Sequence, residues 1–196
     1  MARKSWALIA AVALAASSTT LPAQVPPQAG NAELRAMFEA DQAARTSGKL
    51  IDWEVVGKQD SARRERTRAL IDAGELKTGD DYYHAAFIFQ HSGTASDYLM
   101  AHVLADVAAA KGRDGGQWIA AASLDRYLQH IAQPQIYGTQ FNTPESGVTT
   151  QEPYDRALLP DSLRREAGVP VLAKQEERRL MFQEQYRQAR AQKSAK

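Results

Sequence analysis

The sequence predicts an all-α fold: a compact multi-helix bundle with a long polar loop packed over it and a C-terminal helix. Apolar residues recur at helical spacing along most of the chain, and a glycine follows most of these stretches. Alternating apolar and polar runs are missing, and Val55-Val56 is too short to make a sheet. The 196 residues include no cysteine, which excludes disulfides, thiol nucleophiles and thiolate metal sites.

The first 23 residues have the pattern of a cleaved secretory signal peptide. Arg3 and Lys4 form a positive start, residues 6–16 are apolar but too few to span a bilayer, and Ala23 ends a small-residue cleavage site. An uncleaved N-terminal anchor is the alternative. We expect an exported protein, periplasmic or secreted, without stable membrane insertion after signal cleavage.

Without its signal peptide the chain is nearly neutral. Residues 24–196 carry 22 basic and 23 acidic side chains, a net charge of −1, which gives no electrostatic footprint for nucleic acid or anionic membrane. The segment from Lys174 to Lys196 is a local exception, with seven basic and three acidic residues. It is more typical of a solvated helix than of a binding arm. The length suits a single domain.

The first elements after the signal are an extended leader and two amphipathic helices. Pro26 and Pro27 indicate that residues 24–31 are extended, and a helical domain follows over 32–169. Helical spacing predicts one helix over 32–46 and a second over 58–73, which ends before Gly74.

Three more helices are predicted before the loop, and two after it. Capping residues and glycines place the first three over 78–91, 96–111 and 117–131. After Pro134 the sequence is turn-rich and lacks period, up to a short helix over 160–167. Residues 170–196 are expected to form a C-terminal helix, from Val171 to about Arg190, and a frayed tail.

Several helices turn a charged or titratable group towards their apolar side, which suggests a polar network inside the bundle. Asp41 with Arg45, and His102 with Asp106, are each four residues apart. Both pairs could equally be intrahelical ion pairs at the rim of the core, and we favour that interpretation for them.

His91 and Asp125 are the strongest candidates for catalysis. A neutral imidazole at a helix end can act as a general base, and a buried carboxylate on a facing helix could orient it. Arg126 lies 100° round the helix from Asp125 and is expected to face the loop or an anionic ligand. The alternatives are structural: His91 could hydrogen-bond its own last turn, and Asp125 could accept N–H bonds from the loop.

Residues 135–140 add polar groups around a glycine that permits a tight turn. Gln135, Tyr137, Thr139 and Gln140, together with Gln90 and Arg126, are candidates for binding a polar substrate. The same groups could instead tie an irregular loop to the helices, because a packed loop must satisfy its own backbone.

The chain resembles an uncharacterised bacterial domain family over about residues 32–169. The resemblance is carried by Gln90-His91 at the end of one helix, Asp125-Arg126 in a later helix, and the Gln-x-Tyr-Gly-Thr-Gln loop from Gln135 to Gln140. It implies a compact helical domain in which this polar cluster belongs to the family pattern. The family is a domain of unknown function, so the resemblance implies no activity.

Two hypotheses remain, and the sequence does not decide whether the protein is an enzyme. It could be an exported hydrolase or transferase that uses His91 as base and Asp125 as its partner. It could also be a binding or interaction module for a small polar ligand or a protein partner, with the same residues structural. No phosphate loop, nucleophile elbow or His-Glu-x-x-His spacing occurs. We therefore expect no metal and no cofactor.

Overall fold

The computed structural model describes residues 29–46 and 50–194. The predicted signal peptide, most of the extended leader and the last two residues of the predicted tail lie outside this part of the chain. Helix bounds are α1 (Ala32–Thr46), α2 (Trp53–Asp72), α3 (Gly79–Gln90), α4 (Ala95–Ala110), α5 (Gly116–His130), α6 (Asp161–Glu166) and α7 (Leu172–Ser194).

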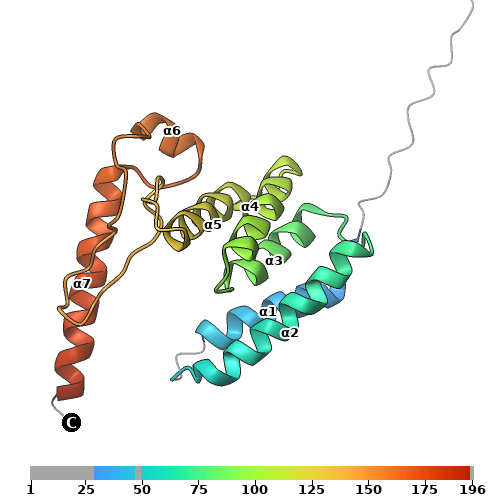
Figure 1. Ribbon diagram of the computed structural model, residues 1–196, viewed down its shortest axis with the longest axis horizontal. Helices are drawn as coiled ribbons and strands as arrows, with labels where there is room; N and C mark the ends of the chain where they lie inside the picture. The colour runs from blue at the N-terminus through green and yellow to red at the C-terminus, as the bar shows by residue number, and fades with distance from the viewer. Residues whose placement is uncertain (1–28, 47–49, 195–196) are drawn as a thin grey trace, which may run out of the picture.

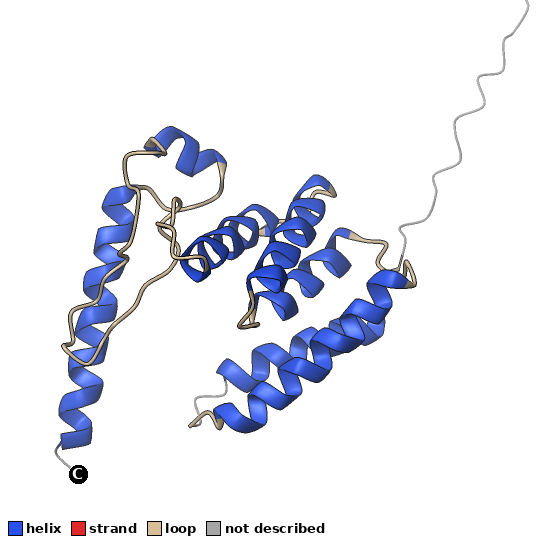
Figure 2. Cartoon of the chain, viewed as in Figure 1, coloured by secondary structure: helices blue, strands red, loops and turns tan. Residues whose placement is uncertain are grey.

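The all-α prediction is confirmed, and within the described residues β-structure is limited to isolated bridges (Figure 2). Helix starts follow their capping residues. Thr78 and Asp81 form a reciprocal capping box at α3, and Thr94 caps α4. Helix α2 begins five residues before the predicted Lys58, because Asp52 accepts the N–H groups of Glu54 and Val55 at 3.1 and 3.2 Å.

The core lies where α3 and α4 meet their neighbours. Helix α4 packs closely against α3 and α5, and α1 and α2 cover α3 from the other side (Figure 1). Small side chains allow this approach: a Cβ on Gly116 would come within 2.7 Å of the Ala109 backbone nitrogen. The buried members of this core are Leu34, Leu70, Leu76, Ala85, Ala86, Ile88, Phe89, Ala101, Leu104, Ala105, Ile119 and Ala120.

The long loop after α5 packs against the end of that helix and then runs along α7 (Figure 1). Figure 1 shows α6 and α7 on the opposite side of α5 from α1 and α2. Across residues 29–46 and 50–194, no helix has both the length and the apolar character that crossing a membrane requires.

Candidate functional site

His91 follows α3 directly, and its imidazole is held by a carboxylate of α1. Its Nδ1 lies 2.9 Å from Oδ2 and 3.1 Å from Oδ1 of Asp41. The Asp41 side chain is 1% exposed and the His91 side chain 17%. A carboxylate accepts a hydrogen bond from Nδ1–H, so in the neutral ring this contact selects the Nδ1–H tautomer, with Nε2 as the ring nitrogen that can accept.

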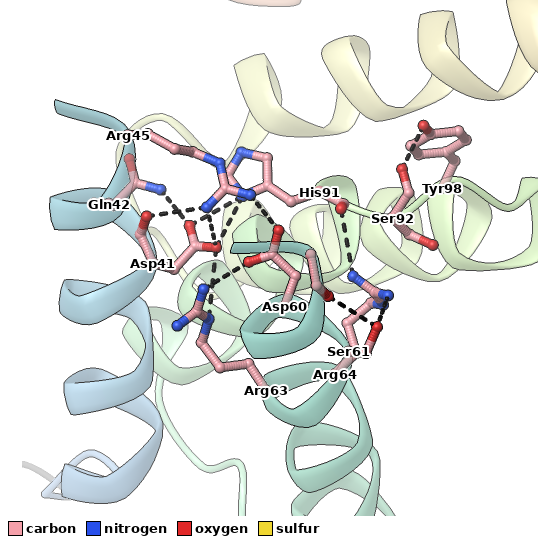
Figure 3. A network of polar contacts seen from close by, with 11 residues as sticks. Asp41, Gln42, Arg45, Asp60, Ser61, Arg63, Arg64, His91, Ser92 and Tyr98 are labelled. Atoms are coloured by element: carbon pink, nitrogen blue, oxygen red, sulfur yellow. Dashed lines mark hydrogen bonds and ion pairs between the residues drawn. The ribbon is translucent and has the colours of Figure 1, made fainter. Parts of the chain in front are cut away.

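Two arginines complete a network around this contact (Figure 3). Arg45 pairs with Asp41 at 2.9 Å and with Asp60 of α2 at 2.5 Å, and Arg63 pairs with Asp60 at 2.6 Å. Burial raises the pKa of Asp60, but the hydrogen bonds from Arg45 and Arg63 outweigh it and leave this pKa below its ordinary value. Within the network two carboxylates therefore balance two guanidinium groups.

A pocket of about 520 Å³ lies beside the network, in the size range of small-molecule sites. We call it the Arg126 pocket. It draws residues from α1, α2, the end of α3, the turn before α4, and α5. Its lining residues are Arg45, Trp53, Gly57, Asp60, Gln90, His91, Ser92, Gly93 and Arg126.

Arg126 differs from Arg45, the other arginine of the pocket, because it has no anionic partner among the described residues. Its Nε is buried and makes no hydrogen bond there. Burial lowers the pKa of its guanidinium, and the nearby charge of Arg45 acts in the same direction. An arginine still carries its charge at neutral pH. An unpaired positive charge in a desolvated position is costly unless a ligand compensates for it.

Three of the predicted site residues come together in this pocket: Gln90, His91 and Arg126. Gln90 is buried in the last turn of α3 and His91 follows it. Arg126 reaches the same space from α5. Gln90 and His91 come from the end of α3 and Arg126 from α5, helices that are separate in sequence but adjacent in the bundle.

Asp125 does not join them. It is fully buried, and its two oxygens bind the loop: Oδ1 accepts the N–H groups of Ile136 and Tyr137 at 2.9 and 3.0 Å. Its Oδ2 accepts the N–H and the hydroxyl of Thr139 at 2.9 and 2.7 Å. The predicted pairing of His91 with Asp125 is therefore replaced by the pairing with Asp41. The physical reason is that a tight loop must find acceptors for its own N–H groups, and Asp125 supplies them.

The other predicted loop residues bind one another. Gln135 accepts the N–H of Gln140 at 3.0 Å and donates through Nε2 to the carbonyl groups of Gln140 and Gln151. Gln140 in turn donates to the Ala122 carbonyl of α5 at 3.3 Å. Thr139 and Gln140 thus fasten the loop to α5, whereas Gln135 holds the loop to itself. None of the three lines the Arg126 pocket.

The Tyr137 carbonyl is bound by residues that sequence reasoning missed. Arg164, which is fully buried, donates to it at 3.0 Å, and Gln175 of α7 donates at 2.9 Å. Gly138 has φ of 76°, and a Cβ there would lie 2.2 Å from the Gln175 side-chain oxygen. Arg164 and Gln175 lie in polar helical stretches, where one arginine or glutamine gives no signal of burial.

His102 and a hollow beside α7 are weaker candidates for a functional site. His102 lies 2.9 Å through Nδ1 from the Ala120 carbonyl, and its Nε2 is 3.5 Å from Asp106 of the same helix. A hollow of about 480 Å³ beside α7 is lined in part by Glu145 and Arg190, but Arg190 already donates to the Glu145 carbonyl. Among the residues that the structure describes, no group of three or more metal-ligating side chains could hold an ion.

The comparisons with known proteins leave the site without a precedent. No protein-family model matches the chain, and no curated protein or solved structure is significantly similar to it. The resemblance to a bacterial domain of unknown function therefore stays a prediction.

Proposed function

We propose that this is an exported protein that binds a small anion, of the carboxylate or phosphate class, in the Arg126 pocket. The observation that carries the proposal is the Arg126 guanidinium, which is desolvated and has no anionic partner among the described residues. Guanidinium groups bind carboxylates and phosphates through paired N–H donors. A ligand of this class would supply the partner that the described residues do not.

The charges around the pocket support an anion rather than a cation. Asp41 and Asp60 are balanced by Arg45 and Arg63, all four within a single network. Arg126 then adds one positive charge beyond this balance. A single negative charge on the ligand would neutralise the pocket, whereas a cationic ligand would double the excess.

His91 favours a second candidate function, a hydrolase or transferase. Asp41 orients its ring through Nδ1, and the ring borders the pocket that holds Arg126. In this reaction class Nε2 would take a proton from water or from a hydroxyl group of the ligand while Arg126 held the anionic group. Asp41 would then have the orienting role that the sequence suggested for Asp125.

Asp125 and the loop from Gln135 to Gln140 support the site indirectly. Their hydrogen bonds hold the loop against α5, the helix that also carries Arg126. We propose that they are positioning residues rather than ligands of the substrate. Export itself rests on the signal-like sequence of the first 23 residues.

The test is a titration of the protein with acetate and with inorganic phosphate, followed through the Nε–H signal of Arg126 in a ¹H–¹⁵N spectrum. We expect a saturable shift of that signal and its neighbours with at least one anion. Replacing Arg126 by Met should abolish the saturable change. Arg165→Met, at an exposed arginine of α6, is the matched control and should bind as the unchanged protein does.

Two results would overturn the proposal. One is the absence of a saturable response to either anion. The other is a response that persists in Arg126→Met and so arises elsewhere. A second measurement distinguishes an enzyme from a protein that only binds the anion. An enzyme should show esterase or phosphatase activity that is lost in His91→Gln while anion binding is retained.

A further inference from the structure

Gly57 is a glycine that the fold does not require. It lies in the interior of α2, where glycine is less favourable than alanine by roughly 0.5–1 kcal/mol. A Cβ at this position would meet no atom within 4 Å, and its φ is not in the left-handed region. Neither close packing nor backbone conformation therefore explains the residue, but Gly57 does line the Arg126 pocket.

Trp53 lies one helical turn before Gly57 and borders the same pocket. Its side chain is 65% exposed, although an indole is among the most favourable groups to bury. Trp53 and Gly57 together form the wall that α2 gives to the pocket, and an indole offers it a flat apolar face. Such a surface can stack with a planar ring of a ligand.

We propose that the anion of this pocket carries a planar apolar group, which lies over Gly57 and against Trp53. This inference rests on the proposed function, because it takes Arg126 as the partner of the anionic group. Gly57 and Trp53 belong to α2, whereas Arg126 belongs to α5. The ligand class is therefore an aromatic carboxylate or aromatic phosphate, with its charged and flat parts bound by different helices.

Gly57 would be a specificity-determining residue. A methyl group on its Cα would occupy space that the protein leaves open, and a larger side chain would cover the wall. The helix itself would gain from the change, since alanine and leucine are better helix formers. A Gly57 variant that loses affinity for the planar ligand but gains stability would show that the glycine serves ligand binding and not the fold.

The experiment compares acetate, phenylacetate and cyclohexylacetate, which share one carboxylate and differ in the attached group. We expect phenylacetate to bind roughly threefold to tenfold more tightly than acetate, the gain of one aromatic contact. Cyclohexylacetate should fall between them because its ring is not flat. Gly57→Leu should remove the preference for phenylacetate over acetate.

The controls keep the two proposals distinguishable. Gly57→Ala should unfold at a higher denaturant concentration and still lose part of the preference, whereas Gln59→Ala, at an exposed position of α2, should keep it. Equal affinities for the three carboxylates, all dependent on Arg126, would overturn this inference and leave the anion site intact. Cyclohexylacetate binding as tightly as phenylacetate would refute the planar group. If none of the three binds through Arg126, this inference is overturned, and the anion site is overturned with it unless inorganic phosphate still binds there.

Discussion

Nδ1 of His91 lies 2.9 Å from a carboxylate oxygen of Asp41, a residue 50 positions earlier in the chain. The contact joins the end of α3 to the middle of α1, at the border of the Arg126 pocket. It gives the imidazole a fixed orientation and a fixed donor. Every chemical role of His91 towards a ligand then falls to Nε2.

The first prediction concerns the tautomer of His91. Because a carboxylate can only accept, the neutral ring should carry its proton on Nδ1. Long-range ¹H–¹⁵N correlation spectra of the neutral ring should show a protonated Nδ1 and an unprotonated Nε2 for His91. In Asp41→Asn the preference of His91 for the Nδ1–H tautomer should weaken, since the asparagine amide can present either an oxygen or an NH₂ group to the ring. His130, which is exposed, is the internal reference. A proton on Nε2 of His91 in the unchanged protein would contradict the interpretation.

The second prediction concerns Asp125, whose carboxylate accepts three backbone N–H groups and one hydroxyl. An asparagine would turn an NH₂ group towards some of these donors. We expect Asp125→Asn to lower the free energy of unfolding by about 3 kcal/mol, since bonds to a charged acceptor contribute about 1.5–3 kcal/mol each. Urea unfolding at neutral pH measures the change.

Asp72→Asn is the control for that experiment, because Asp72 is an exposed carboxylate at the end of α2. It should leave the unfolding free energy within about 0.5 kcal/mol. An Asp125→Asn protein as stable as the original would mean that the loop does not require the carboxylate. Asp125 would then again be a candidate for catalysis.

The third prediction contrasts Arg164, which is fully buried, with Arg126, whose Nε is buried. Arg164 donates to the carbonyl groups of Ile136, Tyr137 and Arg156, whereas Arg126 has no partner among the described residues. Arg164→Met should remove the side-chain donor of the Ile136 and Arg156 carbonyl groups and leave the Tyr137 carbonyl with its bond from Gln175. We expect a cost of about 3 kcal/mol of unfolding free energy. Arg126→Met removes an uncompensated charge, so stability should be unchanged or higher. Chemical denaturation without added anions measures both, and a strongly destabilised Arg126→Met would show that the fold depends on this guanidinium.

The sequence predicted the helices well where their ends are marked. Thr78 and Thr94 signal the starts of α3 and α4, and Gly112 follows the end of α4. The start of α2 is predicted five residues late, at Lys58, because Asp52 is not recognised as its capping residue. For that reason Trp53 and Gly57 were not recognised as pocket residues.

The candidate site could be predicted only in part. The sequence placed His91, Gln90 and Arg126 among the site residues, and the structure brings these three together. It could not pair His91 with Asp41, because periodicity gives the face of each helix but not which helices are neighbours. For Asp125 the residue pattern was compatible with both a catalytic and a loop-binding carboxylate. Only the path of the loop, which has no periodicity, distinguishes them.

The fourth prediction follows from His84, whose side chain is buried in α3 and stacks on Phe38 with ring centroids 4.4 Å apart. Its Nδ1 is buried without a partner among the described residues. Burial lowers the pKa of this imidazole, and the nearby charge of Arg113 lowers it further. The carboxylates of Asp80, Asp81 and Glu39 act in the opposite direction, but the effect of burial is larger.

A histidine with a lowered pKa in the folded state makes stability fall on acidification. Above about pH 6.5 the ring is neutral in both states and contributes no pH dependence. Below that value the unfolded chain binds a proton that the folded protein resists, until the pH reaches the folded-state pKa. His84→Phe keeps the stacked ring without titrating. The unfolding free energy of His84→Phe minus that of the unchanged protein should therefore increase as the pH falls from 7 to 5, as measured by urea unfolding. Parallel stability curves for His84→Phe and the unchanged protein would contradict the assignment.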